Sequence, residues 1–382
     1  MRGRESRIKP GGNPQGRGQP FAGRRHRHRR ALRGTRLAPD ADGDAGVKLW
    51  QRYRLRVRRQ RLRFRAFRSR RDLRTLTDRT RSIRPDGILL VSVIRNERVR
   101  LPYFLDYYRK LGVSHFLFVD NASDDGSRDY LAGQPDASVW VTDRSYRASR
   151  YGVDWVNWLL MHHAHGHWVL SVDVDEFFIY PFCDTRPIRA LTDWLDTYSV
   201  PSFPAMVVDM YPKATDRATA YAEGDDPFEV ARYFDSGNYM ISKNPTYGNL
   251  WIQGGPRARK MFADRPEEAP SLNKIPLVKW RRSYCFASST HMLLPRRLNL
   301  VYDEQGGEKA SGCLLHAKFI STFKAKVAEE LERREHFADS REYLAYARSL
   351  SDENDLWCKW SEKYVNWRQL EILGLMSKGN WA

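Results

Sequence analysis

The sequence predicts an α/β protein built on a mainly parallel sheet that is flanked by helices. From residue 86 onward, continuous apolar runs of strand length alternate with segments of helical spacing, and this pattern is typical of parallel sheets with right-handed crossovers. The first run, ILLVSVI at Ile88–Ile94, has no polar alternation and suits a strand covered on both faces. Polar residues follow three of the runs, at the sheet edge where such folds bind ligands.

The other elements follow in order along the chain. The segment Leu101–Leu111 has helical spacing, with Pro102 in its first turn and Gly112 just past its end. We expect three further strands, at Phe116–Val119, Val139–Val141 and Trp168–Val172. Helices should lie between them, at Arg128–Leu131 and Tyr151–His165. Amphipathic spacing then predicts helices at Phe319–Phe337, Tyr343–Leu350 and Tyr364–Leu373.

The charge divides the chain into a basic arm and a nearly neutral body. The 382 residues carry 65 Lys and Arg against 46 Asp and Glu, a net charge of +19. Residues 1–84 hold 28 of these basic and 6 of these acidic side chains, a net of +22, which leaves −3 for residues 85–382. We predict a disordered basic arm over residues 1–46 and a basic amphipathic helix with its linker over 47–84. The main domain should cover 85–317, and a helical region packed on it should cover 318–382.

The composition argues against several classes of protein. No apolar stretch approaches the ~18 residues of a transmembrane helix, and the N-terminus lacks the apolar core of a secretory signal. The four cysteines lie far apart without a C-x-x-C pair, which argues against a zinc ribbon or a disulfide scaffold. A body of charge −3 also gives no reason to bind nucleic acid. We expect a cytoplasmic protein that can lie peripherally at the inner face of the membrane.

Residues 47–75 form the expected basic amphipathic helix. Five apolar residues recur at spacings of three, four and seven with arginines between them, namely Trp50, Tyr53, Val57, Phe64 and Phe67. Such a helix suits an anionic membrane surface, because arginines contact the headgroups while aromatic rings enter the interface. A helix packed on its own body is an equal alternative, and a nucleic-acid contact is a weaker third one.

Polar residues follow the first, second and fourth predicted strands, at Arg95–Glu97, Asp120–Ser127 and Asp173–Asp175. In extended backbone, Asp173 and Asp175 would point to the same side. Two adjacent carboxylates repel each other unless a cation lies between them, and Mg²⁺ or Mn²⁺ prefers such oxygen ligands. The D-x-D pattern therefore predicts a divalent-metal site that could neutralise a departing diphosphate.

Three blocks in this order, IRNE at Ile94–Glu97, VDNASDDGS at Val119–Ser127 and VDVDEF at Val172–Phe177, resemble family 2 glycosyltransferases. The similarity covers about residues 86–372 and includes GGPRAR at Gly254–Arg259 and LLHAKF at Leu314–Phe319. Members of this family have the Rossmann-like GT-A fold and transfer a sugar from a nucleotide-activated donor with a divalent metal. The resemblance implies an inverting transferase that uses a UDP- or GDP-sugar donor and a glycan or lipid-linked hydroxyl acceptor.

The resemblance also implies roles for single residues. It places the donor near the strand ends, in contact with Arg95, Asn96, Glu97, Asp120, Asn121, Asp125 and Asp173. Asp175 would be the main ligand of the manganese or magnesium ion, with Asp173 and His316 completing its shell. Arg257 and Arg259 lie in a glycine-rich loop, where guanidinium groups can grip a donor phosphate, although surface ion pairs are the competing interpretation.

Inversion at the sugar requires one general base for the acceptor hydroxyl. Asp209 is the first candidate, because it ends the apolar run AMVV, which predicts a strand leading into the cleft. Asp303 and Glu304 are the alternatives, and Trp251 or Trp280 could stack on a sugar ring.

Other functions remain open from the residues alone. A sugar nucleotidyltransferase on a similar sheet would carry a glycine-rich phosphate loop after the first strand, where this chain has Arg95-Asn96-Glu97. A glycosidase would use two carboxylates that flank the scissile bond without a metal. A non-catalytic binding protein with a basic arm and a degenerate transferase body would not need the acidic blocks.

Overall fold

The structure is a computed structural model that describes residues 49–213, 221–302, 309–333, 335 and 356–381. These residues belong to one compact unit, Asp40–Ala382. The predicted arm over 1–46, the predicted helix Tyr343–Leu350, and the base candidates Asp303 and Glu304 lie outside the described residues.

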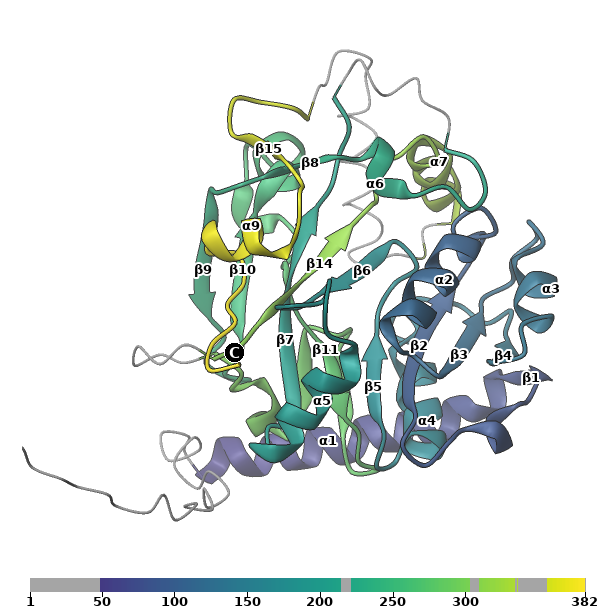
Figure 1. Cartoon of the computed structure of the whole chain (residues 1–382). Coiled ribbons are helices and arrows are strands. Elements are labelled where there is room, and N and C mark those ends of the chain that lie inside the picture. Colours follow the sequence, from purple (N-terminus) through teal and green to yellow (C-terminus); the bar gives the residue numbers. More distant parts are fainter. Residues whose placement is uncertain (1–48, 214–220, 303–308, 334, 336–355, 382) are drawn as a thin grey trace, which may run out of the picture. The chain divides into compact units, whose positions relative to one another are not determined.

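A nine-stranded sheet forms the centre of the described part of the chain (Figure 1). In spatial order its strands are β1 (Arg74–Thr77), β4 (Ala137–Val141), β3 (His115–Asp120), β2 (Ile88–Ile94), β5 (Trp168–Ser171), β11 (Asn273–Lys279), β7 (Ser202–Asp209), β14 (Gly312–His316) and β6 (Glu176–Ile179). Strands β1, β11 and β6 run opposite to the other six. The predicted α/β class and mainly parallel sheet are therefore confirmed.

Helices flank the sheet (Figure 1), and the described part of the chain also contains three two-stranded sheets. The helices are α1 (Leu49–Ser69), α2 (Leu101–Leu111), α3 (Ser127–Ala132), α4 (Val153–His163), α5 (Ile188–Thr197), α6 (Pro227–Val230), α7 (Phe323–Arg333) and α9 (Trp367–Ile372). The strand pairs are β8 (Tyr233–Asp235) with β15 (Ser361–Lys363), β9 (Tyr239–Lys243) with β10 (Leu250–Gly254), and β12 (Cys285–Ser288) with β13 (Met292–Leu294).

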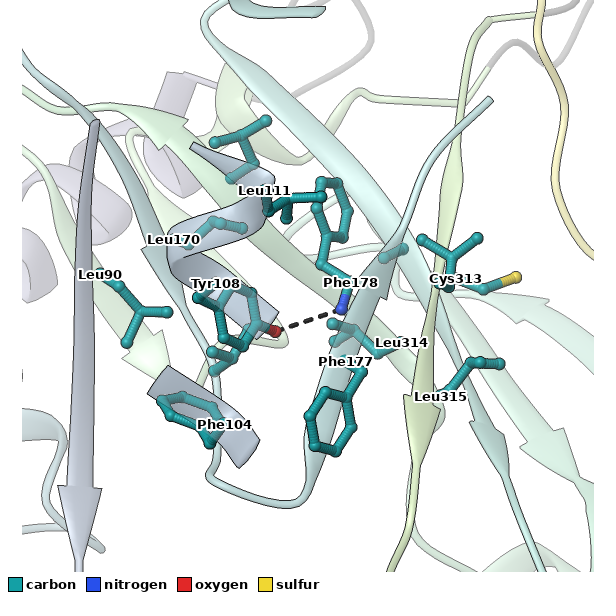
Figure 2. Packing of buried hydrophobic residues seen from close by; sticks show 14 of the residues in the cluster. Leu90, Phe104, Tyr108, Leu111, Leu170, Phe177, Phe178, Cys313, Leu314 and Leu315 are labelled. Atoms are coloured by element: carbon teal, nitrogen blue, oxygen red, sulfur yellow. Dashed lines mark hydrogen bonds between the residues drawn. The ribbon is translucent and has the colours of Figure 1, made fainter. Parts of the chain in front are cut away.

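The core lies on both faces of the sheet, because successive strand residues point to opposite sides. Leu90 of β2 belongs to the cluster that contains α2 and α5, whereas its neighbours Leu89 and Val91 belong to the cluster that contains α4. Figure 2 shows the α2 side of this arrangement. There the Tyr108 hydroxyl accepts a hydrogen bond from the backbone N–H of Phe178 at 3.1 Å and donates to the carbonyl of Glu176 at 2.7 Å.

Some elements match their predicted bounds and others do not. Strand β2 and helix α2 coincide with the predicted Ile88–Ile94 and Leu101–Leu111. The predicted helix Phe319–Phe337 is described as α7 from Phe323, and Tyr364–Leu373 shortens to α9. Strand β11 lies antiparallel between β5 and β7, an insertion that the βα alternation did not predict. No helix in the described ranges is long and apolar enough to cross a bilayer.

Candidate active site

A cavity of about 850 Å³ opens at the carboxyl edge of the parallel strands. Its lining residues come from the end of β2, the turn from β5 to β6, the end of β14 and helix α7, elements that Figure 1 labels. Pockets that hold small molecules and cofactors are usually 300–1,000 Å³, so a nucleotide-sized ligand fits. The predicted site residues in this wall are Arg95, Glu97, Asn121, Asp173, Asp175, Arg257 and His316.

An alternating series of four charged side chains lies at the floor of the cavity, where Asp175, His316 and Arg257 line the wall and the buried Asp209 lies behind them. His316 and Asp209 end the neighbouring parallel strands β14 and β7 in the same register. The Nδ1 of His316 lies 2.7 Å from Oδ1 of Asp209, and its Nε2 lies 3.3 Å from Oδ2 of Asp175. The Nε of Arg257 donates to the other oxygen of Asp209 at 2.7 Å. We call Asp175, His316, Asp209 and Arg257 the ionic series.

The ionic series is fully charged near neutral pH. Burial by itself lowers the pKa of His316, but Asp175 and Asp209 outweigh burial and raise this pKa to about 9. Burial raises the pKa of Asp209, but Arg257 and His316 outweigh it and bring this pKa down to about 2. The pKa of Asp175 is likewise held well below its usual range, because His316 outweighs the effect of burial.

A second cluster lies next to the ionic series on strand β11. Lys274 is buried, and its Nζ contacts both Asp173, at 3.1 Å, and Glu176. Burial lowers the pKa of Lys274, but the two carboxylates outweigh it and raise the pKa above its usual range. Asp173 and Asp175 therefore have different partners, Lys274 and His316. The expected same-side geometry does not apply, because β5 ends at Ser171 and the two aspartates lie in the turn before β6.

The glycine-rich loop directs Arg257 toward the cavity floor but not Arg259. Gly254 has a φ of +151°, and a Cβ there would lie 2.5 Å from the carbonyl oxygen of Asn238, so the close approach requires glycine. Arg257 then reaches Asp209, whereas Arg259 donates to both carboxylate oxygens of Asp235, at 2.8 and 2.9 Å. Arg259 is not among the described residues that line the cavity.

Two loops that follow β2 and β3 form the other half of the cavity edge, and we call residues 95–98 and 120–127 the loop half. Side chains of one loop hold the backbone of the other: Ser123 accepts from the N–H of Asn96, and Ser127 accepts from that of Glu97. Asp125 accepts from the backbone N–H groups of Arg98 and Ser127, at 2.8 and 2.9 Å. Asp125 therefore shapes the loop.

Asp120 and Asn96 have structural partners as well. Asp120 is fully buried and accepts hydrogen bonds from the backbone of Ser123 and the guanidinium of Arg128. Asn96 has a left-handed φ of 51°, and its side-chain oxygen accepts from the N–H of Asp124. Among the described residues, the cavity wall includes Asn121 but neither of these two.

Helix α7 brings a set of charges that sequence reasoning did not assign to the site. Lys326 contacts Glu97, Glu329 accepts from Arg95 at 2.7 Å, and Arg333 donates to Asn121 at 3.4 Å. The spacing of 326, 329, 330 and 333 places these charges on one helical face, which was a readable signal. Lys274 had a weaker signal, because it follows Asn273 at the polar start of strand β11, NKIPLVK. The sequence did not show which partners these charged residues would contact.

Asp209 occupies a different environment from the one expected of a general base. Its side chain is 1% exposed, and its two oxygens accept from His316 and Arg257. Asp209 therefore holds His316 in position, and its low pKa makes it a weak proton acceptor. Of the two tryptophans, Trp251 lines the cavity near His291, whereas Trp280 is fully buried in the core.

The ionic series fits a divalent ion with few protein ligands. Asp175 supplies one donor, and the Nε2 of His316 would supply a second once metal binding displaces its proton, while Asp209 on Nδ1 fixes the ring orientation, as carboxylates commonly do for metal-binding histidines. In the described ranges there is no group of three or more His, Cys, Asp or Glu side chains placed to hold a metal ion. Mg²⁺ needs only one or two carboxylates when waters and substrate phosphates fill the remaining positions.

Comparisons with known proteins found solved structures that resemble the chain at low sequence identity. No family model matches the chain, and no curated protein matches it either. Two solved structures that resemble it are a protein assigned as a glucose-1-phosphate thymidylyltransferase from Bacillus anthracis and a UTP-bound UGPase from Acinetobacter baumannii. The first has 8% identity and a TM-score of 0.27 and covers 75% of this chain and 93% of its own. The second has 10% identity and a TM-score of 0.28 and covers 70% and 100%. Similarity at this level says nothing about substrate or reaction.

Proposed function

We propose that the protein is a metal-dependent, inverting glycosyltransferase that moves a sugar from a UDP- or GDP-sugar to a hydroxyl group of a glycan or lipid-linked acceptor. The observation that carries the proposal is the position of the ionic series at the floor of a nucleotide-sized cavity. The three sequence blocks that resemble family 2 glycosyltransferases lie at or beside the same edge.

The charges around the cavity support a diphosphate ligand. Several basic side chains line the cavity wall together with Asp175, namely Lys274, Lys318, Lys326, Arg100 and Arg257. Guanidinium and ammonium groups bind phosphate oxygens by charge-assisted hydrogen bonds. A divalent ion held by Asp175 and His316 would supply Lewis acidity to the departing diphosphate.

The residues of the chain divide the remaining work. In the transfer, the acceptor oxygen forms a bond to the anomeric carbon, the bond from that carbon to the diphosphate breaks, and the acceptor proton passes to a base. Arg257 holds Asp209, Asp209 holds His316, and His316 holds Asp175, so that the carboxylate of Asp175 and the ring of His316 are fixed before the ligand arrives.

We propose Glu267 in place of Asp209 as the base. The two carboxylate oxygens of Asp209 already contact His316 and Arg257. Glu267 and Glu268 are exposed residues of the cavity wall, and Glu268 accepts a hydrogen bond from Arg265 at 3.0 Å. Replacement of Glu267 by Gln should reduce sugar transfer without weakening nucleotide binding, because only the proton acceptor is lost. Equal transfer by the variant would exclude this role.

Metal-dependent nucleotide binding tests the proposal most directly. UDP and GDP are titrated into the protein with Mn²⁺ and with EDTA, by isothermal calorimetry. One of them should bind in the presence of Mn²⁺, and Asp175→Asn should weaken this binding roughly 100-fold, because a metal ligand is lost. Asp106→Asn, an exposed aspartate paired with Lys110, serves as the matched control and should bind as the wild type does.

Two results would count against the proposal. If the nucleotide affinity is the same with Mn²⁺ and with EDTA, and the same in the wild type and in Asp175→Asn, the metal site is excluded. Release of pyrophosphate from a nucleoside triphosphate and a sugar phosphate would instead identify a sugar nucleotidyltransferase.

A further inference from the structure

Helix α1 has two opposite faces that differ in what they contact. Leu55, Leu62 and Ala66 are buried, and the two leucines pack in a cluster with Tyr247, Cys285 and Leu294. Arg65 adds an ion pair with the buried Asp154 at 2.9 Å. The helix is therefore fixed on the body by one side, which was one of the three alternatives that the sequence left open.

The opposite face carries a row of exposed aromatic side chains, which we call the aromatic stripe. Trp50, Tyr53, Phe64 and Phe67 are 67%, 57%, 60% and 46% exposed. With 3.6 residues per turn, the stripe lies about 180° from the buried leucines. Fixing the helix by its buried side therefore points the stripe outward, away from the cluster that holds Leu55 and Leu62.

Arginines flank the aromatic stripe on both sides. The 21 residues of α1 contain nine arginines and no acidic residue. Arg54, Arg61 and Arg68 lie beyond one edge of the stripe, and Arg52 and Arg56 beyond the other, all of them exposed. Aromatic rings between rows of cations match the boundary between headgroups and acyl chains of an anionic bilayer, where each ring enters the interface and each arginine meets a phosphate.

We propose that the aromatic stripe of α1 docks the protein on an anionic lipid surface, with the helix lying in the plane of the membrane. This goes beyond the proposed transfer reaction and does not depend on it. A bilayer accounts for the aromatic rings and the arginines together, since the rings lose water contact while the arginines gain anionic partners.

Charge and the aromatic side chains together argue against three other occupants. Residues 1–48 carry 13 Lys and Arg against 4 Asp and Glu, so they offer no excess of negative charge to the arginines of α1. A second copy of α1 would bring nine further arginines to the same surface. A double-stranded nucleic acid would pair with the arginines through its phosphates, but its bases are stacked inside the duplex and would leave the four aromatic side chains without an apolar environment.

Vesicle binding of the full-length protein tests the proposal. Co-sedimentation is measured at physiological salt with vesicles of phosphatidylcholine alone and with vesicles that contain 30% phosphatidylserine. We expect binding to the anionic vesicles only. Replacing Trp50 and Phe64 by Ala should weaken it about tenfold, from the loss of buried apolar area. The matched control replaces Trp360 and Val365, which are 62% and 69% exposed outside α1, and should change nothing.

The arginines are tested in the same assay. Replacing Arg54 and Arg61 by Gln should weaken binding about 25-fold, at roughly fivefold per arginine near an anionic surface. The exposed pair Arg281 and Arg282, replaced in the same way, is the control for total charge. Circular dichroism and the midpoint of urea unfolding verify that each variant folds. We expect all of them to fold, because the replaced side chains are exposed.

The outcomes separate this proposal from the proposed reaction. Mn²⁺-dependent nucleotide binding should stay unchanged in all α1 variants, so loss of vesicle binding alone supports the docking role. Equal binding to neutral vesicles, or wild-type binding by both α1 variants, would overturn it. Preference for a double-stranded DNA competitor over anionic vesicles would also overturn it and assign the arginines to a nucleic acid.

Discussion

The loop half and the ionic series hold polar side chains at the same cavity edge by different means. In the loop half, short polar side chains bond to backbone N–H groups no more than about 30 residues away, as Asp125 does with Ser127 and Arg98. In the ionic series, buried side chains bond to each other across long separations, such as the 107 residues between Asp209 and His316. At Asp125, neutral donors and an exposed carboxylate make the first arrangement tolerant of change, whereas burial of charge makes the second dependent on every member.

The largest difference should appear when one charge is removed from the ionic series. Asp209→Ala leaves the buried Arg257 and His316 without the carboxylate that both contact, and we expect a loss of about 3–5 kcal/mol in the free energy of unfolding. Urea unfolding measures it. Asp193→Ala, at an exposed helix position, should change stability by less than about 0.5 kcal/mol. A small effect at Asp209 would remove the distinction between the two regions.

The pH dependence of stability should be the next largest effect. The folded pKa of His316 is raised from 6.5 to about 9, so the folded state binds this proton more tightly than the unfolded state. The resulting stabilisation is complete below pH 6.5 and is lost as the pH rises through 9. It corresponds to about 3 kcal/mol.

The histidine variant identifies this contribution. Urea unfolding at pH 6.5 and pH 9, with EDTA present, should show the decrease in the wild type and a flatter profile in His316→Gln. Similar profiles for the two proteins would mean that His316 is not held between two charged carboxylates.

The smallest effect is expected in the loop half. Asp125→Ala removes two hydrogen bonds to backbone N–H groups, and because Asp125 is exposed, water can take the place of its carboxylate, so the change should cost about 1 kcal/mol. Asp124→Ala, at the exposed neighbouring position, is the matched control, because its backbone N–H keeps the bond to Asn96. A loss at Asp125 as large as that at Asp209 would show that the loops, too, act as a tightly coupled unit.

Much of the fold could be read from the sequence where the signal is local. Continuous apolar runs gave β2 its bounds, and helical spacing with Pro102 and Gly112 gave those of α2. The insertion of β11 between β5 and β7 had no local signal, because antiparallel pairing there joins segments about 70 to 110 residues apart. The sequence also did not decide whether the aromatic face of α1 is buried or exposed, since the spacing of these residues suits both. The structure buries its leucines instead and leaves the aromatic stripe outside.

The candidate site divides in the same way. The sequence by itself placed Asp173, Asp175 and the loop half at the carboxyl edge, because position along a parallel strand determines which edge a residue reaches. Only the tertiary structure decided the partners: Lys274 for Asp173, His316 for Asp175, Arg257 for Asp209 and Asp235 for Arg259. The sequence does not show which opposite charge a charged side chain will pair with. That pairing depends on distance and burial, which are set only when strands distant in the sequence pack together.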